Sequence, residues 1–387
     1  MPNMFPYLSD HNELHRVRFE KAEAMRAAGI DPYPAKFTAS HLSTQILSAE
    51  DEYVDRADRR VSVLGRVLAI RRFGKSAFFH VRDRAGQIQV FIDKKRIDEA
   101  SFRVYKEFLD SGDIVGVEGT VFRTKMGEVT IHADRLVLLT KSLRPLPEKW
   151  KGLTDKETRY RQRYVDLIAN PGVSELFVKR SRMIASLRRW LDDQEFLEVE
   201  TPMMQPLYGG ASARPFTTHH NALDMELYLR IAPELYLKRL MVGGMHRVYE
   251  INRNFRNEGV STQHNPEFTM LELYAAGWDC EEMMQFVEEL VRHAMGAVLG
   301  DTPARFGELE VDLSEPFPRL SILGGLEKFC GVKARWDMSL EEARAAVAPR
   351  HVPTDVQSAV DILVHVFEQE VEQHLVRPTF VTGFPKA

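Results

Sequence analysis

The sequence predicts an α+β protein of several domains, in which a β-barrel precedes a larger domain of helices and strands. The chain has 387 residues, 44% of them hydrophobic, which suffices for two or three domains of roughly 150 residues each. Residues 61–139 consist of short β-rich runs broken by glycine and aspartate, whereas helical spacing dominates after residue 174. These observations separate a barrel from a second, mixed domain.

The N-terminal segment, residues 1–58, predicts a charged helix over residues 12–29 that ends at Gly29. Two prolines in the following Asp31-Pro32-Tyr33-Pro34 favour extended backbone. Met1–Asp10 lacks a basic region followed by an apolar run, and no stretch approaches the roughly 18 apolar residues of a membrane span. Secretion and membrane insertion are therefore not expected.

Five β-rich runs in residues 59–146 predict an OB-fold barrel, with a helix near residues 99–109 before the fourth strand. The runs are VSVLGRVLAI, SAFFHVRD, GQIQVFI, DIVGVEGTVFRT and GEVTIHADRLVLL. Such barrels often bind single-stranded nucleic acid on one face. Residues 61–150 hold 17 Lys and Arg against 11 Asp and Glu, a net charge of +6 in a chain of net charge −4. This favours a polyanionic partner, and the alternative is a merely solvated basic surface.

The stretch from Leu143 to Leu167 mixes two prolines with dense charge, which predicts a hinge over residues 147–170. The domain of residues 171–387 then begins with a long basic helix over residues 174–194 and a strand over residues 196–199. Further helices are expected at 281–299, 340–347 and 356–375, and a short strand at 380–382. Cys280 and Cys330 lack metal-ligand spacing, so neither a disulfide framework nor a zinc site is indicated, and a reducing cytoplasm fits.

Residues 253–274, RNFRNEGVSTQHNPEFTMLELY, gather the residue types of a nucleotide and ammonium site. Arg256 offers a planar fork of donors for a phosphate or carboxylate, and Phe268 a flat face for a purine. Glu272 and Tyr274 lie two apart on an expected strand, so both project to one face, where a carboxylate and a phenol fit an ammonium group.

Three segments resemble the class II aminoacyl-tRNA synthetases, in the form carried by lysyl-tRNA synthetases. Phe-Arg-Asn-Glu-Gly, a polar loop and His-Asn-Pro-Glu-Phe-Thr resemble the second class II motif. The helix over 174–194 with Phe-Leu-Glu-Val-Glu-Thr-Pro resembles the first motif, which builds a homodimer interface. Gly209-Gly210-Ala211 and LYLRIAPELYLKRL resemble the amino-acid-binding segment. The resemblance spans residues 12–385 and implies a catalytic antiparallel sheet flanked by helices.

The resemblance implies that lysine and ATP form lysyl-adenylate and pyrophosphate, and that lysine is then transferred to tRNA(Lys). The transition state gathers negative charge at the α-phosphorus, so positioned cations matter more than a nucleophilic side chain. Mg²⁺ is expected to bridge the phosphates. The resemblance implies that Arg256 is the catalytic residue and contacts both the α-phosphate and the substrate carboxylate. It also implies that Glu258 lies at the adenine, that Phe268 stacks on the ring and that His264 lies near the terminal phosphates. Asn265 is expected to support this network.

The implied lysine-binding residues are Gly210, Glu234, Arg256, Glu272 and Tyr274. Glu234 receives the α-ammonium, and a glycine lets the backbone approach a small ligand. Aspartyl- and asparaginyl-tRNA synthetases share the fold class and form an alternative. Selecting an acidic side chain calls for a cation at the end of the pocket, whereas Glu272 would repel aspartate there.

Three barrel residues match anticodon-contacting positions of lysyl enzymes: Phe78, Gln89 and Glu128. Stacking on Phe78 would contribute about 1 to 3 kcal/mol per base, while Gln89 and Glu128 would read base edges. Three other aromatics fit the barrel core equally well: Phe73, Phe79 and Phe91.

The sequence is expected to stop before the third class II motif, which in the family carries a phosphate-binding arginine and follows the acidic magnesium ligands. Metal ligands are therefore expected outside this sequence, and feeble or absent lysine activation by this chain is anticipated. A remaining alternative is a non-catalytic RNA-binding or regulatory protein that keeps the barrel.

Overall fold

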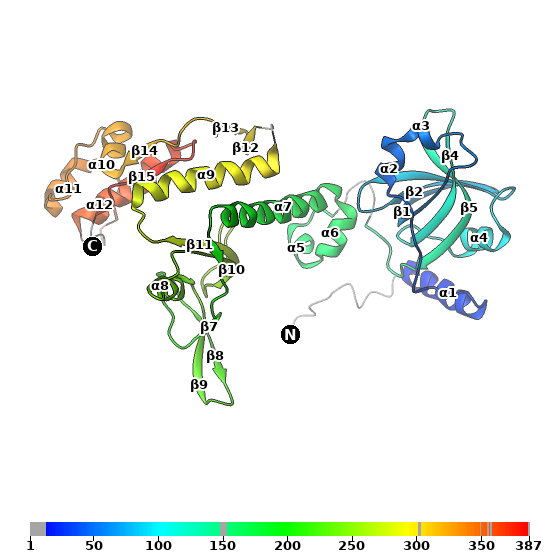
Figure 1. Cartoon of the computed structure of the whole chain (residues 1–387), viewed down its shortest axis with the longest axis horizontal. Helices are drawn as coiled ribbons and strands as arrows, with labels where there is room; N and C mark the ends of the chain where they lie inside the picture. The colour runs from blue at the N-terminus through cyan, green and yellow to red at the C-terminus, as the bar shows by residue number, and fades with distance from the viewer. Residues whose placement is uncertain are drawn as a thin grey trace. The chain divides into compact units, whose positions relative to one another are not determined.

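The computed structural model describes residues 13–147, 153–300, 303–348, 350–353, 356 and 358–385. The chain divides between Val173 and Ser174 into two compact units, whose elements are labelled in Figure 1. Each unit has its own core. Residues 1–12 of the predicted N-terminal segment and residues 148–152 of the predicted hinge lie outside the described ranges. Within those ranges, no helix combines the length and apolar character that a membrane crossing requires.

The first unit contains the predicted five-stranded OB-fold barrel. The strands are β1 (Arg60–Phe73), β2 (Ser76–Arg82), β3 (Gln87–Asp93), β4 (Ile114–Arg123) and β5 (Val129–Thr140). They close in the order β1-β2-β3-β5-β4, with β3 and β5 paired in parallel. The helix predicted before the fourth strand is confirmed as α4 (Glu99–Arg103), which continues into a π-helical turn, Val104–Phe108.

Alternation along the strands separates the barrel core from an outer face. On β2, Ala77, Phe79 and Val81 are buried, and the intervening Phe78 and His80 point to the other side. Phe79 thus belongs to the core, as the sequence allowed.

Phe73, which was expected to fit the barrel core, lies outside it at the end of β1, where it is 60% exposed. Its ring lies 6.4 Å from that of Phe78, centroid to centroid. Phe91 is half-buried and stacks on Phe78 at 4.5 Å. The outer face of the barrel therefore carries more aromatic surface than the sequence analysis assigned to it.

Short helices surround the barrel. The predicted N-terminal helix is α1 (Glu13–Ala27), which sends Met25 into the barrel core. The next two are α2 (Ser43–Ser48) and α3 (Glu50–Tyr53). The predicted hinge contains two helices that the sequence analysis did not foresee, α5 (Lys156–Arg161) and α6 (Arg163–Ala169). The first begins at Asp155, whose carboxylate accepts from the Thr158 N–H at 2.7 Å.

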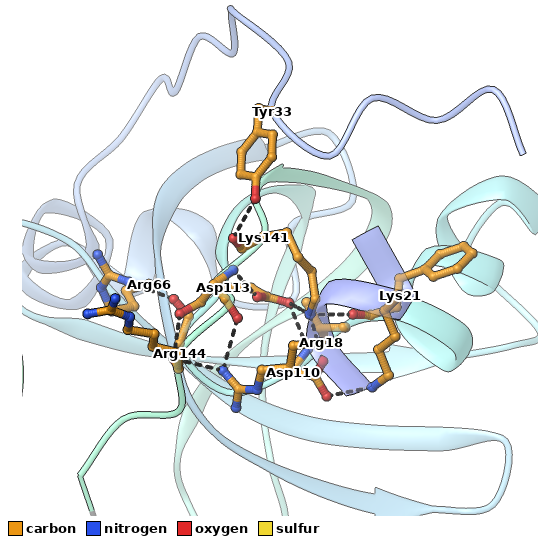
Figure 2. Close-up of polar contacts among 12 residues, drawn as sticks. Arg18, Lys21, Tyr33, Arg66, Asp110, Asp113, Lys141 and Arg144 are labelled. Atoms are coloured by element: carbon orange, nitrogen blue, oxygen red, sulfur yellow. Dashed lines mark hydrogen bonds and ion pairs between the residues drawn. The ribbon is translucent and has the colours of Figure 1, made fainter. Parts of the chain in front are cut away.

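A buried ammonium group joins α1, the barrel and the segment after β5 (Figure 2). The Lys141 Nζ donates to Asp110 Oδ2 at 2.6 Å and to Asp113 Oδ2 at 2.7 Å, and the Lys141 and Asp113 side chains have no exposed surface. Lys21 of α1 reaches Asp110 Oδ1 at 2.7 Å. Arg18 of α1 donates to the carbonyls of residues 142 and 144. One polar cluster therefore fixes α1 and the exit of the chain from the barrel.

The second unit is built around a short sheet, β11-β10-β6. The strands are β6 (Leu197–Glu198), β10 (Arg247–Phe255) and β11 (Glu267–Ala275). β10 and β11 are antiparallel, and β6 adds in parallel, at the place of the strand predicted for residues 196–199. Two predicted helices, α7 (Pro171–Asp193) and α9 (Cys280–Leu299), supply Leu191 and Phe286 to the core behind this sheet.

A hairpin and a helix lie between β6 and β10 in the chain. Strand β9 (Met225–Leu229) pairs with both β7 (Met204–Gln205) and β8 (Phe216–His220). Helix α8 (Glu234–Val242) follows directly and lies near β10 and β11 in Figure 1. It therefore carries its first residue, Glu234, toward the sheet.

A separate helical cluster occupies the end of the chain and has its own apolar core (Figure 1). The predicted helix over 340–347 is confirmed as α11 (Leu340–Val347), and the predicted strand as β15 (Phe380–Thr382). The helix expected over 356–375 begins only at Ala359. The remaining elements are β12 (Ala304–Phe306), β13 (Leu309–Val311), β14 (Arg319–Ser321), α10 (Ile322–Gly325), a π-helical turn (Leu326–Cys330), α12 (Ala359–Val366), a second π-helical turn (Phe367–Val371) and a 3-10 turn (Glu372–His374).

Candidate functional site

The β10–β11 ribbon has one apolar and one polar face. Tyr249, Leu271 and Leu273 lie on the face that packs against α7 and α9. Since side chains alternate along a strand, the next residues point to the opposite side. The register pairs Val248 with Tyr274, Glu250 with Glu272, Asn252 with Met270 and Asn254 with Phe268. The polar face therefore carries three of the predicted site residues, Phe268, Glu272 and Tyr274, and Arg256 follows directly after β10.

Arg256 and Phe268 meet at one end of this face. The Arg256 N–H donates to the Pro266 carbonyl at 2.8 Å, which continues the ladder beyond β10. The Arg256 guanidinium lies over the Phe268 ring, 5.2 Å from its centroid. Arg256 Nε is buried and has no hydrogen-bond partner in the described part of the chain. A cation and an aromatic face are thus available together at this end.

Three other predicted nucleotide-binding residues lie in the exposed turn between β10 and β11. The Glu258 N–H donates to the Arg256 carbonyl at 3.0 Å, which keeps this residue beside the arginine backbone. His264 Nδ1 lies 2.9 Å from Ser261 Oγ, and Asn265 Nδ2 donates to the Glu267 carbonyl at 2.6 Å. Their side chains make no direct contact with Phe268 among the interactions of the described residues, but the turn holds them at the same end.

Glu272 and Tyr274 meet near the other end, as predicted from their spacing. The Tyr274 hydroxyl donates to Glu272 Oε2 at 3.2 Å. Burial, with the negative charges of Glu234 and Glu250, raises the pKa of Glu272, while Tyr274 and the positive charge of Arg230 oppose the shift. Burial, Glu272 and Glu234 also raise the pKa of Tyr274. The pair is thus a half-buried carboxylate with a protonated phenol beside it.

Gly210 and Glu234 complete this end. Gly210 has a φ of +85°, and a Cβ built on it would lie 2.8 Å from Glu234 Cβ. Glu234 begins α8, and its carboxylate accepts from Lys238 Nζ at 2.6 Å, one helical turn later. Because the charge of Glu234 acts on Glu272, the structure brings Gly210, Glu234, Glu272 and Tyr274 into one neighbourhood.

Two buried charged residues of this site escaped the sequence analysis. The Arg230 and Glu250 side chains are 0% and 1% exposed, and Arg230 Nη1 lies 2.7 Å from Glu250 Oε1. Glu250 Oε2 accepts from Thr201 Oγ1 at 2.6 Å. The available signal was alternation: Glu250 lies two and four residues before Asn252 and Asn254 on the same strand, and therefore on the same face.

The outer face of the barrel brings the other three predicted site residues together. Gln89 Nε2 donates to Glu128 Oε2 at 2.6 Å, and Gln89 Oε1 accepts from Thr130 Oγ1 at 3.0 Å. His80 Nε2 lies 2.9 Å from Glu128 Oε1. Phe78 lies two residues before His80 on β2 and therefore on the same face. This face thus combines a polar network with an exposed aromatic edge.

The aromatic surface of the barrel continues beyond Phe78. Phe91, Phe122 and His132 have ring centroids 5.1 to 6.0 Å apart. Burial and the charge of Arg96 lower the pKa of His132, so its ring is neutral at physiological pH. Stacked and tilted rings beside hydrogen-bonding groups are the means by which OB-folds hold single-stranded bases. The sequence signal for Phe122 and His132 was their position on alternating strand residues.

Comparisons with known proteins agree with this arrangement. Residues 155–387 match the family of class II tRNA synthetases for D, K and N, and residues 61–139 match the OB-fold nucleic acid binding domain. The lysine–tRNA ligase of Pelotomaculum thermopropionicum is 50% identical over 379 residues, which cover 97% of this chain and 74% of the relative. That of Carboxydothermus hydrogenoformans is 49% identical over 375 residues, covering 97% and 76%. That of Bacillus cytotoxicus is 47% identical over 384 residues, covering 97% and 77%. The chain therefore belongs to the class II aminoacyl-tRNA synthetases, within the family of lysine–tRNA ligases.

Proposed function

We propose that this chain activates lysine with ATP and transfers it to tRNA(Lys). The observation that carries the proposal is the polar face of the β10–β11 ribbon. It holds Arg256 and Phe268 at one end and the Glu272–Tyr274 pair at the other. The acidic end suits the two ammonium groups of lysine. The cation and the aromatic ring at the other end suit the substrate carboxylate and a nucleotide.

Lysine is proposed to lie along the Glu234–Glu272 end of the face. Glu234 would receive the α-ammonium, and Glu272 with Tyr274 would receive the side-chain ammonium. Gly210 leaves room beside Glu234, since any larger residue would meet its Cβ. The substrate carboxylate would point to Arg256. Aspartate fits poorly, because its side-chain carboxylate would face Glu272 in a half-buried site.

ATP is the proposed second substrate. Phe268 would stack on the adenine, Glu258 would contact its edge, and His264 and Asn265 would support the phosphates. The Arg256 guanidinium lies beside the Phe268 ring, so a nucleotide stacked on Phe268 would have its α-phosphate within reach of Arg256.

The proposed chemistry needs no protein nucleophile. The lysine carboxylate attacks the α-phosphorus, the bond to the β-phosphate oxygen breaks, and pyrophosphate leaves. A hydroxyl of the 3′-terminal ribose of tRNA(Lys) then attacks the acyl carbon, and AMP leaves. Arg256 would act in the first step by stabilising the charge that accumulates on the α-phosphate oxygens.

Magnesium is the proposed companion of ATP, since a divalent cation bridges nucleotide phosphates in such reactions. Among the described residues, no group of three or more His, Cys, Asp or Glu is placed to hold a metal ion. No step above depends on a protein-bound metal ion.

The barrel is proposed to bind the anticodon of tRNA(Lys). Phe78 would stack on one base, and the Gln89–Glu128 pair would read base edges. Gln89 is hydrogen-bonded to Thr130, and Glu128 is hydrogen-bonded to His80. These contacts fix the Gln89–Glu128 pair before RNA binds, which lowers the entropy cost of ordering the two side chains.

We further propose a symmetric homodimer in the cytoplasm. Helix α7 resembles the interface helix of the family, and its Leu176 and Val178 are 64% and 45% exposed, which suits contact with a second copy. Both cysteines are free thiols, which suits a reducing compartment.

Lysine-dependent ATP–pyrophosphate exchange tests the activity. We would measure it on this chain, with the Pelotomaculum relative as a reference. Exchange is expected with lysine and not with aspartate or asparagine. Exchange driven by aspartate, or tight tRNA(Lys) binding without adenylate formation, would contradict the proposal.

A further inference from the structure

Carboxylates crowd the amino-acid end of the site. Glu250 and Glu272 are register partners in the antiparallel ribbon, so their side chains lie side by side on the polar face. Glu234 adds a third negative charge from α8. Like charges at such short range oppose each other's ionisation unless a cation lies nearby.

Arg230, which follows β9, supplies that cation. Its Nε donates to the Arg253 carbonyl at 3.0 Å, and its Nη1 donates to Glu250 Oε1 at 2.7 Å and Thr201 Oγ1 at 3.0 Å. Its Nη2 is buried and has no hydrogen-bond partner in the described ranges. Arg230 thus retains one unused donor beside the pocket.

Glu250, in contrast, is fully satisfied. Its Oε1 also accepts from Asn252 Nδ2 at 3.1 Å, and its Oε2 accepts from Thr201 Oγ1 at 2.6 Å. These donors and the buried Arg230 guanidinium occupy both oxygens of the Glu250 carboxylate. The Arg230–Glu250 pair therefore adds no net charge to the pocket.

We propose that Glu250 is a specificity-determining residue of the amino-acid pocket: it neutralises Arg230 and so keeps Glu272 available for the side-chain ammonium of the substrate. This inference rests on the proposed role of Glu272 in lysine binding. The positive charge of Arg230 already acts on Glu272. Without Glu250, that charge would be uncompensated, would attract Glu272 and would repel the substrate ammonium.

Charged and titratable groups reach Glu272 from every element around it: Tyr274 on β11, Glu250 on β10, Arg230 after β9, and Glu234 with Lys238 on α8. The charges of Arg230 and Glu250 cancel in their ion pair. Lys238 Nζ lies 2.6 Å from Glu234 Oε1. Glu272 forms no ion pair among the described residues. It is therefore the carboxylate left for a cationic ligand.

The test starts with Glu250→Gln, which keeps the size of the side chain and removes its charge. Lysine affinity, measured by titration calorimetry at neutral pH, is expected to fall by about tenfold or more. Norleucine, which has the carbon chain of lysine but lacks the side-chain ammonium, is the control ligand. Its affinity is expected to change by less than about threefold. The acid limb of lysine binding is expected to move to lower pH, because Glu272 would pair with Arg230.

The double variant Arg230→Gln/Glu250→Gln separates charge from structure. It removes both charges, so lysine affinity is expected to return to within about threefold of the unaltered chain. Glu250→Asp keeps the charge and is expected to stay within the same range. A double variant as weak as Glu250→Gln, or an equal loss for lysine and norleucine, would assign Glu250 a structural role and overturn the inference.

Glu272→Gln in the unaltered chain distinguishes this inference from the proposed function. If the unaltered chain does not bind lysine, or Glu272→Gln leaves its affinity unchanged, the proposed lysine site is wrong. If Glu272→Gln weakens binding and Glu250→Gln does not, only the role of Glu250 is wrong. Should Glu250→Gln fail to fold, by circular dichroism, the double variant and Glu250→Asp decide, since loss of lysine binding in both would overturn the inference.

Discussion

Gly210 lies so close to Glu234 that no side chain fits between them. Its φ of +85° is one that L side chains rarely adopt, and an added Cβ would lie 2.8 Å from Glu234 Cβ and 3.3 Å from Ala232 Cβ. The glycine therefore fixes where the first residue of α8 can place its carboxylate. The backbone conformation at Gly210 and the proposed binding of the α-ammonium by Glu234 therefore both require that no side chain fill this space.

Gly210→Ala is expected to weaken lysine binding by about tenfold, because the new methyl group must displace Glu234 from the α-ammonium position. Titration calorimetry with lysine measures the change. Gly296→Ala in α9 is the matched control, since a Cβ there meets nothing within 4 Å, and its lysine affinity should equal that of the unaltered chain. Equal affinities for the two variants would show that Gly210 does not shape the pocket.

Individual residues differ in how far the sequence revealed them. Glu272 and Tyr274 were predicted to share a face from their spacing alone, and their hydrogen bond agrees. Arg230 and Glu250 were missed, because charged residues are usually exposed and a buried pair leaves no mark in composition or periodicity. They meet only because Arg230, which follows β9, lies beside β10 and donates from Nε to the Arg253 carbonyl.

Among the elements, α1 depends on the buried cluster around Lys141 (Figure 2). Burial raises the pKa of Asp113 even with Lys141 beside it. Burial also acts on Asp110, but Lys141 and Lys21 outweigh it and hold the pKa of Asp110 below its usual range. The ammonium of Lys141 is therefore the group that makes two neighbouring carboxylates tolerable inside this unit.

Lys141→Met is expected to lower the local stability of the barrel by about 3 to 5 kcal/mol, because it leaves buried carboxylates without their cation. Hydrogen exchange of the β4 and β5 amides in the full chain measures this. Lys21→Met removes the partly exposed partner of Asp110 and should cost less than about 1 kcal/mol. Comparable losses in the two variants would contradict a central role for Lys141.

The secondary structure shows which local signals suffice. Strands β1 to β5, α1, α7, α9 and α11 followed from clear periodicity or capping, and the structure places them close to the predicted bounds. Helices α5 and α6 were hidden by the prolines and charges around the hinge. The β8–β9 hairpin carries few β-branched residues, and the π-helical turns depend on local packing that no residue pattern signals.

At the scale of the whole molecule, the two proposed binding functions belong to units with separate cores. The barrel core and the core behind the β10–β11 ribbon share no residue. Positive charge is concentrated in residues 61–150, whereas the rest of the chain is net acidic. The nucleic-acid partner and the amino acid are therefore expected to respond to different substitutions.

A crossed experiment tests this separation. Phe78→Ala is expected to lower tRNA(Lys) affinity by roughly 5- to 150-fold, the range for losing one stacked base, and to leave lysine affinity unchanged. Glu272→Gln is expected to do the reverse. Filter binding at fixed salt and calorimetry measure the two affinities. If either variant changes both affinities to a similar extent, the two functions are not separable in this way.

The two-faced ribbon also limits how this protein can misfold. A slip of one residue in the pairing of β10 with β11 would turn one strand over relative to the other. Leu271 and Leu273 would then face water while Glu272 and Tyr274 entered the core beside α7 and α9. Such a chain would lose its site and its packing in the same step. A register-shifted ribbon therefore cannot give a structure that is well packed but inactive, and only the correct pairing of β10 with β11 preserves the core.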